Sequence, residues 1–308
     1  MLEARNCNIR INNTGIMAQN VTLNSSNSVV PVQSVGKRGF DRYVPNGPVT
    51  HTLSIDYVLK TEREPNYQIY SSLKNLSDSS SHSPALISIG GISGNFYLNS
   101  YSVSSSPNNI SKAQASYVNF DLSLSGYLND SKQDSYSILT TESGEDIETE
   151  DGLSLFMTEG SLDYAGDYDG FANGWTTFLY ENNELSQDPV YDFGYSFQAE
   201  WEPTYLIGSK TASQVDLMNY RESISLIREV YTKPKYSGED IYLSQNESGD
   251  FDGTNRDLDL RIYGLYRLCN GTGDFLSFSL SGANITSSTV NFQLNDMVLT
   301  ETTATRIG

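Results

Sequence analysis

The sequence predicts a mainly β protein made of two tandem β-sandwich or β-barrel domains, each with one short helix. Serine, threonine, asparagine, glycine and 21 tyrosines dominate the 308 residues, whereas good helix formers are sparse. Apolar and polar residues alternate over many segments, which is the period of a strand with one buried face. Several segments also recur in the same order about 172 to 177 residues apart, which indicates a tandem duplication.

A predicted β-hairpin closes each copy, over Gly94–Leu124 in the first and Gly273–Leu299 in the second. Serine-, asparagine- and glycine-rich segments between the alternating runs are typical of hairpin connections. The alternating apolar residues are Tyr101, Val103, Val118, Phe120 and Leu122 in the first copy, and Phe278, Leu280, Val290, Phe292 and Leu294 in the second.

A second match lies upstream of the hairpins. Pro31–Arg38 and Pro203–Lys210 place a proline, a glycine and a basic residue at the same spacing. Each match is followed by an alternating apolar run, which predicts another strand. These runs contain Leu53, Ile55, Tyr57 and Leu59 in the first copy and Ile224 and Leu226 in the second.

The duplication predicts the domain boundaries. The first domain covers residues 1–130, an acidic linker covers 131–151, and the second domain covers 152–308. Gly152–Phe156 is matched with Asn8–Ile11, which leaves an insertion at about 162–190 in the second copy.

Helix is predicted at one place. The predicted helix is Pro65–Leu76. Its apolar residues Ile69, Leu73 and Leu76 fall on one helical face, and Pro65 stands at the start of the helix, where proline is tolerated. Ser213–Tyr231 is compatible with either a helix or a strand.

The net charge of −19 belongs almost wholly to the second half of the chain. Residues 1–140 hold 9 acids and 10 bases, and residues 141–308 hold 29 acids and 9 bases. A chain this acidic is poorly suited to gripping nucleic acid. The charge suits a surface that repels DNA, or an ordinary solvated face that keeps the protein soluble. No run is long and apolar enough to span a membrane, and Met1–Arg10 has no apolar core, so we expect neither a membrane protein nor a secreted one.

No pattern of an enzyme is present. His51 and His82 are the only histidines, one at the head of an alternating run and one in a serine-rich loop. The sequence has no nucleophile elbow, no phosphate-binding glycine loop and no zinc-protease motif. We therefore expect no catalytic residue and no cofactor.

Two acidic clusters could supply oxygen ligands to calcium. Neither matches the twelve-residue EF-hand loop, and Asp-Gly pairs also form ordinary turns. Aromatic residues between the acids of the first cluster could stack on a sugar or pack on a neighbouring segment. The weak calcium candidates are Asp163, Asp167, Asp169, Asp250, Asp252 and Asp257.

The order of the segments Asn8–Asn12, Pro31–Arg38, Thr50–Leu59 and Ser100–Leu124 resembles the structural proteins of tailed-bacteriophage virions, in particular the tail tube family. The resemblance covers most of the first copy and the hairpins of the second. The acidic linker and the 162–190 insertion depart from it.

The resemblance implies a non-enzymatic subunit of a tail tube, whose sheets join edge to edge into rings that stack around a DNA-conducting channel. Two copies per chain would give a homo-oligomeric ring of three chains with pseudo-sixfold symmetry, or a hexamer. The two hairpins would carry ring assembly. Partners would be further copies and other tail, neck or baseplate proteins, with genomic DNA passing without specific binding. The location would be the virion, after assembly in the host cytoplasm.

Two alternatives remain. A neck, tube-terminator or baseplate ring protein with the same fold would share these features. A secreted β-sandwich adhesin would instead bind calcium or glycan through the 162–190 insertion.

Overall fold

The computed structural model is mainly β, with one helix in the part of the chain that it describes. The described residues are 9–16, 18–36, 38–39, 41–59, 67–78, 82–106, 109–121, 123–126, 136–138, 156–158, 177–181, 184–185, 190–209, 211–229, 256–263, 275–291 and 299–308.

The first half of the chain contributes seven strands and the helix. These elements are β1 (Ile9–Ile11), β2 (Thr14–Gly15), β3 (Asn20–Val32), β4 (Arg42–Val58), α1 (Tyr67–Asp78), β5 (Ala85–Ile89), β6 (Ile92–Ser105) and β7 (Lys112–Asn119).

The second half contributes another seven strands. They are β10 (Thr177–Glu181), β11 (Glu184–Leu185), β12 (Val190–Thr204), β13 (Gln214–Glu229), β14 (Arg256–Tyr263), β15 (Phe275–Asn291) and β16 (Leu299–Ile307). Between the halves, β8 (Tyr136–Ile138) and β9 (Phe156–Thr158) pair only with each other.

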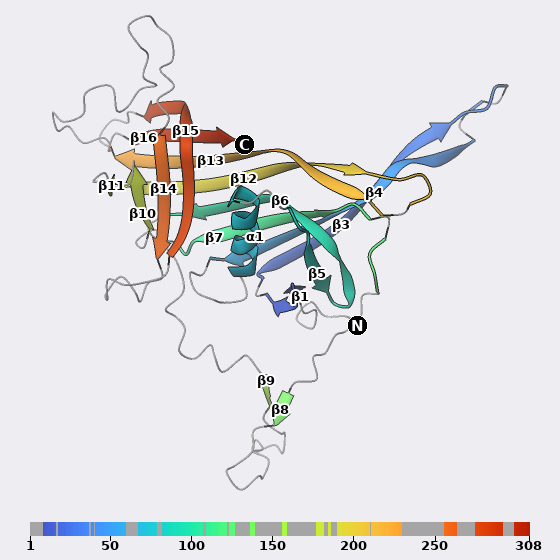
Figure 1. The fold of residues 1–308 in the computed structure, drawn as a ribbon, viewed down its shortest axis with the longest axis horizontal. Helices are drawn as coiled ribbons and strands as arrows, with labels where there is room; N and C mark the ends of the chain where they lie inside the picture. The colour runs from blue at the N-terminus through green and yellow to red at the C-terminus, as the bar shows by residue number, and fades with distance from the viewer. Residues whose placement is uncertain are drawn as a thin grey trace, which may run out of the picture.

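All fourteen strands of the two halves belong to one antiparallel sheet (Figure 1). Its long strands follow the order β3, β4, β7, β6 in the first half and continue as β12, β13, β16, β15 in the second. The prediction of a mainly β fold is confirmed. The strands of the two halves share a single open sheet, whereas the sequence suggested one sandwich or barrel for each half.

The two halves repeat the same pairing scheme. In the first half β1 pairs with β2 and β5, β5 pairs with β6, β6 with β7, β7 with β4, and β4 with β3. In the second half β10, β11, β14, β15, β16, β13 and β12 make the corresponding pairs. The boundaries of the two predicted domains stay a prediction. β10 holds the place of β1, and of the predicted match Gly152–Phe156 only Phe156, in β9, lies within the described residues. Because β10 and β11 lie within 162–190, that range is more than an insertion.

The two long hairpins repeat their register as well. Pro31 pairs with Tyr43 in the β3–β4 hairpin, and Pro203 pairs with Val215 in the β12–β13 hairpin, so the outer ends of the two hairpins share one register, from the tip to a register shift that follows in each. At the tips, Gly36 and Gly208 have φ angles of 89° and 85°. These angles favour glycine, because a Cβ atom is strained in the left-handed region. The match between Pro31–Arg38 and Pro203–Lys210 in the sequence therefore reflects the same backbone conformation of the glycine at both hairpin tips.

An irregularity in the ladder recurs too. The β6–β7 pairing shifts register between Leu98 and Ser100, and the β15–β16 pairing shifts between Ile285 and Ser287. A β-bulge is a defined feature that bends its strand. Its presence at the same place indicates that β15 is the counterpart of β6, and β16 the counterpart of β7.

The second hairpin differs from its prediction. β15 runs from Phe275 to Asn291 without a turn, and the returning strand is β16. The segment around Gly282 looks like a turn, but β-branched residues follow it, and such residues favour a continued strand. Gly282, at φ 67°, is accommodated within the strand.

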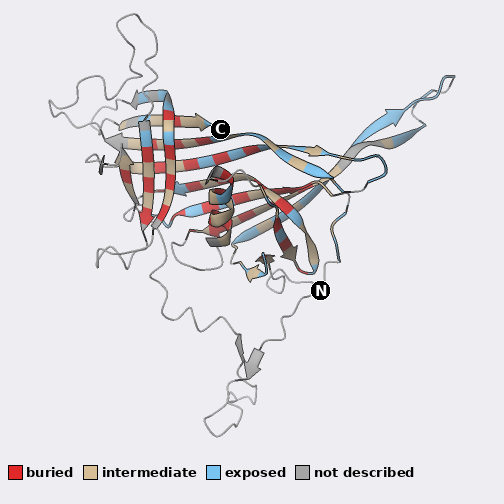
Figure 2. Ribbon diagram, viewed as in Figure 1, coloured by how far each residue is buried: buried red, intermediate tan, exposed pale blue. Residues whose placement is uncertain are grey.

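The core lies against one face of the sheet, where buried residues alternate with exposed ones (Figure 2). Leu53, Ile55 and Tyr57 on β4 are at most 1% exposed, as are Ile224 and Leu226 on β13. The predicted helix is confirmed as α1, which buries Ile69, Tyr70, Leu73 and Leu76 against this face. The segment left open between helix and strand, Ser213–Tyr231, contains strand β13.

We expect Ile55→Ala and Leu226→Ala to lower the free energy of unfolding by similar amounts, about 2–5 kcal/mol each. The two residues hold corresponding places, because Ile55 pairs with Val21 and Leu226 with Phe193. Urea unfolding would measure the loss. Val35→Ala, at a hairpin tip where the side chain is wholly exposed, is the control and should change stability by less than about 0.5 kcal/mol. A loss confined to one core variant would contradict the correspondence.

Candidate functional site

The two halves are joined by backbone pairing between β6 and β12. The antiparallel pairs run from Ser100 opposite Gln198 to Ser105 opposite Phe193. We call this pairing the joint. It places the last long strand of the first half beside the first long strand of the second half, so that the sheet continues without a break (Figure 1).

Aromatic rings cover the joint on its core side. Tyr101 on β6 and Tyr195 on β12 lie with ring centroids 6.3 Å apart, and Phe278 on β15 lies 6.1 Å from Tyr101 and 4.8 Å from Tyr195. All three are at most 3% exposed. Large aromatic rings bury much apolar area, and neighbouring rings add a directional attraction. The start of β15 therefore clamps the two halves together.

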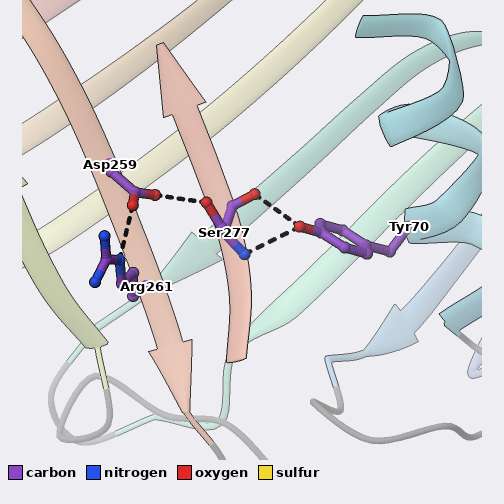
Figure 3. Close-up of polar contacts among 4 residues, drawn as sticks. All are labelled: Tyr70, Asp259, Arg261 and Ser277. Atoms are coloured by element: carbon purple, nitrogen blue, oxygen red, sulfur yellow. Dashed lines mark hydrogen bonds and ion pairs between the residues drawn. The ribbon is translucent and has the colours of Figure 1, made fainter. Parts of the chain in front are cut away.

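The helix of the first half also binds the second half, as Figure 3 shows. The Tyr70 hydroxyl donates to the Ser277 carbonyl at 2.7 Å and accepts from the Ser277 amide at 3.0 Å. The Ser277 hydroxyl donates to Asp259 at 2.6 Å, and Arg261 pairs with the same carboxylate at 2.7 Å. This chain of contacts fixes α1 over β14 and β15.

The outer part of β12 crosses onto the first half. The Trp201 indole donates to the Leu98 carbonyl at 3.0 Å, and its ring lies 5.0 Å from that of Tyr97. The Tyr205 hydroxyl donates to the Phe120 carbonyl at 2.8 Å. These contacts extend the joint beyond its ladder toward the hairpin tip.

A polar pair occupies corresponding places in the two halves, and its members are buried except for Arg306. His51 on β4 pairs across the ladder with Asn119 on β7, and Glu222 on β13 pairs with Arg306 on β16. The His51 Nδ1 atom lies 2.7 Å from the Ser25 hydroxyl. Arg306 forms an ion pair with Glu222 at 2.7 Å, and the other oxygen of Glu222 accepts from Tyr195 at 2.9 Å. Since buried polar groups need partners, these contacts fix the strands in register.

At the two ends of the order of long strands, β3 and β15 each have one side without a ladder partner in the described residues. β3 pairs only with β4, and β15 pairs from Asn284 to Asn291 only with β16. Neither strand contains an aspartate, glutamate, lysine or arginine, although 19% of the chain is charged. Proteins commonly protect an open edge with charged residues, above all lysine. These two edges lack that protection.

The structure places the predicted hairpin residues as follows. Tyr101 and Val103 are buried at the joint, Val118 lies near the end of β7, and Phe120 follows that strand half-buried. Phe278 and Leu280 are buried where β15 pairs with β14. Val290 lies in the part of β15 that pairs with β16. Leu122, Phe292 and Leu294 lie outside the described residues.

Sequence reasoning missed four aromatic residues at the joint: Tyr70, Tyr195, Trp201 and Tyr205. A usable signal was present, because Phe193, Tyr195, Phe197, Ala199 and Trp201 alternate as a one-sided strand does.

Of the calcium candidates, only Asp257 lies within the described residues, where it accepts a hydrogen bond from the Gly282 amide at 2.9 Å. Asp163, Asp167, Asp169, Asp250 and Asp252 lie outside them. Within the described ranges, no three His, Cys, Asp or Glu residues gather into a metal site. The helix described here is too short and polar to cross a membrane.

No family model matches the chain, and no curated protein matches it. Twelve chains of solved structures do match. One is the crystal structure of SPP1 Dit (gp 19.1), described as a paradigm of the hub adsorption apparatus in phages that infect Gram-positive bacteria. It is 10% identical, with 98% of this chain and 99% of that chain covered and a TM-score of 0.25. A TM-score of this size does not establish a shared fold, so function is argued below from this chain's own residues.

Four buried tyrosines should make the protein sensitive to alkali. Burial raises the pKa of Tyr57, Tyr101, Tyr117 and Tyr195 above the usual value near 10, and Glu222 raises that of Tyr195 further. Above about pH 10 the unfolded chain loses protons that the folded chain keeps. Stability should therefore hold below about pH 10 and fall above it, by up to about 1.4 kcal/mol per pH unit for each tyrosine.

Urea unfolding between about pH 8 and 11.5 would measure this slope, which the linkage relation converts into protons released. Tyr101→Phe should make the slope shallower by about one proton. Tyr43→Phe, which removes a hydroxyl from a side chain that is 64% exposed, is the matched control. A stability that stays level through this range would contradict the proposed role of the buried hydroxyls.

Proposed function

We propose that the chain is a structural subunit of a phage tail tube, which assembles into rings that stack around a DNA-conducting channel. The joint is the observation that supports this proposal. Two halves with the same strand pairing are united edge to edge by β6 and β12, and the outermost long strands again present open edges. Repeating the joint from chain to chain would extend the sheet without any new kind of contact.

The face of the sheet away from the core suits a channel wall. Its central strands carry serine, threonine, asparagine and glutamine, including Ser54, Ser102, Ser116, Ser196 and Ser223. We assign this face to the channel. Hydroxyl and amide side chains with few lysines or arginines give DNA phosphates little to bind, which favours sliding. An acidic surface that repels DNA, which the net charge also suits, is not needed for this function.

The rest of the proposal follows the duplication. Each chain would supply two tube-like domains, so a ring of six domains would contain three chains. We assign the protein no enzymatic activity, because the buried polar contacts described above hold paired strands in register and fix α1 over β14 and β15. Its location would be the virion, with other tail proteins as further partners.

Two other functions would use the same features. A neck, tube-terminator or baseplate ring protein would form one ring without stacking. A secreted adhesin would act as a monomer and bind calcium or glycan through residues 162–190.

Electron microscopy of the purified full-length protein, with mass photometry to count chains, tests the proposal. We expect rings of three chains that stack into tubes with a central channel. Single rings that never stack would favour the neck or baseplate alternative. A monomer that persists at high concentration, and that melts at a higher temperature with calcium, would contradict the tube and favour the adhesin.

A further inference from the structure

We propose that the open edge of β15 pairs antiparallel with β3 of a second copy of this chain, in the register of the joint. The inference rests on the proposed ring and names its contact residues. Thr289 of one chain would lie opposite Asn24 of the next, and Ser287 opposite Ser26.

The joint supplies the template, because its two strands have counterparts at the two open edges. The shared bulge makes β15 the counterpart of β6, with Ser287 in the place of Ser100. The shared hairpin register makes β3 the counterpart of β12, with Pro31 in the place of Pro203. A contact that forms between β6 and β12 should therefore form between β15 and β3 as well.

Counting along the strands from these matched residues fixes the register of the new contact. Ser102 lies opposite Ser196 in the joint, and their counterparts are Thr289 and Asn24. The proposed pair of Thr289 with Asn24 therefore repeats the polar pair at the centre of the joint.

The neighbouring pair supports the same register. Val103 lies opposite Tyr195 in the joint, and this pair corresponds to Val290 and Leu23, which are both apolar. The proposed register thus sets polar positions opposite polar ones and apolar positions opposite apolar ones. A slip of one residue would mix the two faces.

Charge does not oppose this pairing. β3, β6 and β15 contain no charged residue, and the part of β12 in the joint, Phe193–Gln198, contains none either. Like charges placed directly opposite each other destabilise a ladder. In an acidic protein, strands free of charge are therefore the ones that two copies can bring together.

Exposure in the single chain marks the open edge of β3. Phe197 and Ala199 on β12 are buried beside β6, whereas their counterparts Ser25 and Asn27 on β3 are exposed. In the single chain, β3 thus has no neighbouring strand on this side, whereas β6 occupies that place beside β12.

Two exposed apolar residues flank the proposed contact, one on each side. Val29 is 49% exposed on β3 and corresponds to Trp201, which packs on Tyr97. Ile307 is 67% exposed at the end of β16 and corresponds to Phe120 beside the joint. A second copy in the proposed register would bring the β3–β4 hairpin over the end of β16, as the β12–β13 hairpin lies over Phe120.

Disulfide trapping tests the register. The variant Asn24→Cys with Thr289→Cys is made in a chain whose native cysteines, Cys7 and Cys269, are replaced by serine. Opposed antiparallel residues lie within disulfide range. We expect oxidation to yield covalent dimers and closed trimers on non-reducing gels, and reduction to reverse them.

Two variants are matched controls. Asn20→Cys with Thr289→Cys shifts the register by four residues, about 13 Å along the strand, and should give little crosslink. Ser102→Cys with Ser196→Cys should crosslink within one chain and leave the mass unchanged, because these residues already lie opposite each other.

A charge exchange checks the contact without cysteine chemistry. Asn24→Lys with Thr289→Lys places like charges in opposition and should abolish ring formation, whereas Asn24→Glu with Thr289→Lys should restore it. Both positions are exposed in the single chain, and each variant's folding is checked by its melting curve.

Electron microscopy of the same samples separates the two proposals. Rings whose chains crosslink equally well in the shifted register, or fail to crosslink in the proposed one, would overturn the inference and leave the ring function standing. A folded protein that forms no ring in any variant would overturn the proposed function itself.

Discussion

The backbone pairing of β6 with β12 is the constraint on which the rest of the molecule depends. It turns two sets of seven strands into one sheet, and it places Tyr101, Tyr195 and Phe278 where they can pack together. Without it, each half would expose two uncharged edges instead of one. Ladder bonds are strong where both partners are withdrawn from water, and leaving buried backbone groups unpaired is costly. The joint therefore covers one open edge of each half, and the same contact builds a core that the two halves share.

Because the joint is made by the backbone, the side chains around it have been free to differ between the halves. His51 with Asn119 and Glu222 with Arg306 hold the same ladder positions, yet one pair joins a histidine to an asparagine and the other is an ion pair. Trp201 corresponds to Val29 in the same way. Register, bulge and glycine φ angles are shared where residue types are not. This explains why a duplication that is plain in the pairing leaves only short matches in the sequence.

The local features of the fold could be predicted from the sequence, because local rules govern them. Period-two alternation located β4 and β6, and one helical face located α1. The alternation assigned to Val118, Phe120 and Leu122 did not locate β7, which ends at Asn119 and buries Ala113, Ala115 and Tyr117. The path of β15 could not be predicted, since the segment around Gly282 satisfies the rules for a turn and the rules for a bent strand equally. The joint could not be predicted from the sequence for another reason. Its two strands are far apart in the sequence, and no local sequence pattern indicates which distant strands pair. The absence of charge on β3, β6 and β15, however, can be read from the sequence, and β6 is the one of these three strands that meets the other half within the chain.

The proposed edge contact, which is the same within and between chains, would also restrict the assembly. Each joint rotates one half relative to the next, and a head-to-tail contact closes into a ring only when these rotations sum to a full turn; otherwise it produces an open helix. A chain of two halves adds two rotations at a time, so any closed ring contains an even number of halves. A ring of three chains would require a rotation of about 60° between neighbouring halves at every joint, within the chain as well as between chains. A change that alters the angle of the internal joint would therefore alter closure of the whole ring, although it touches no surface between chains.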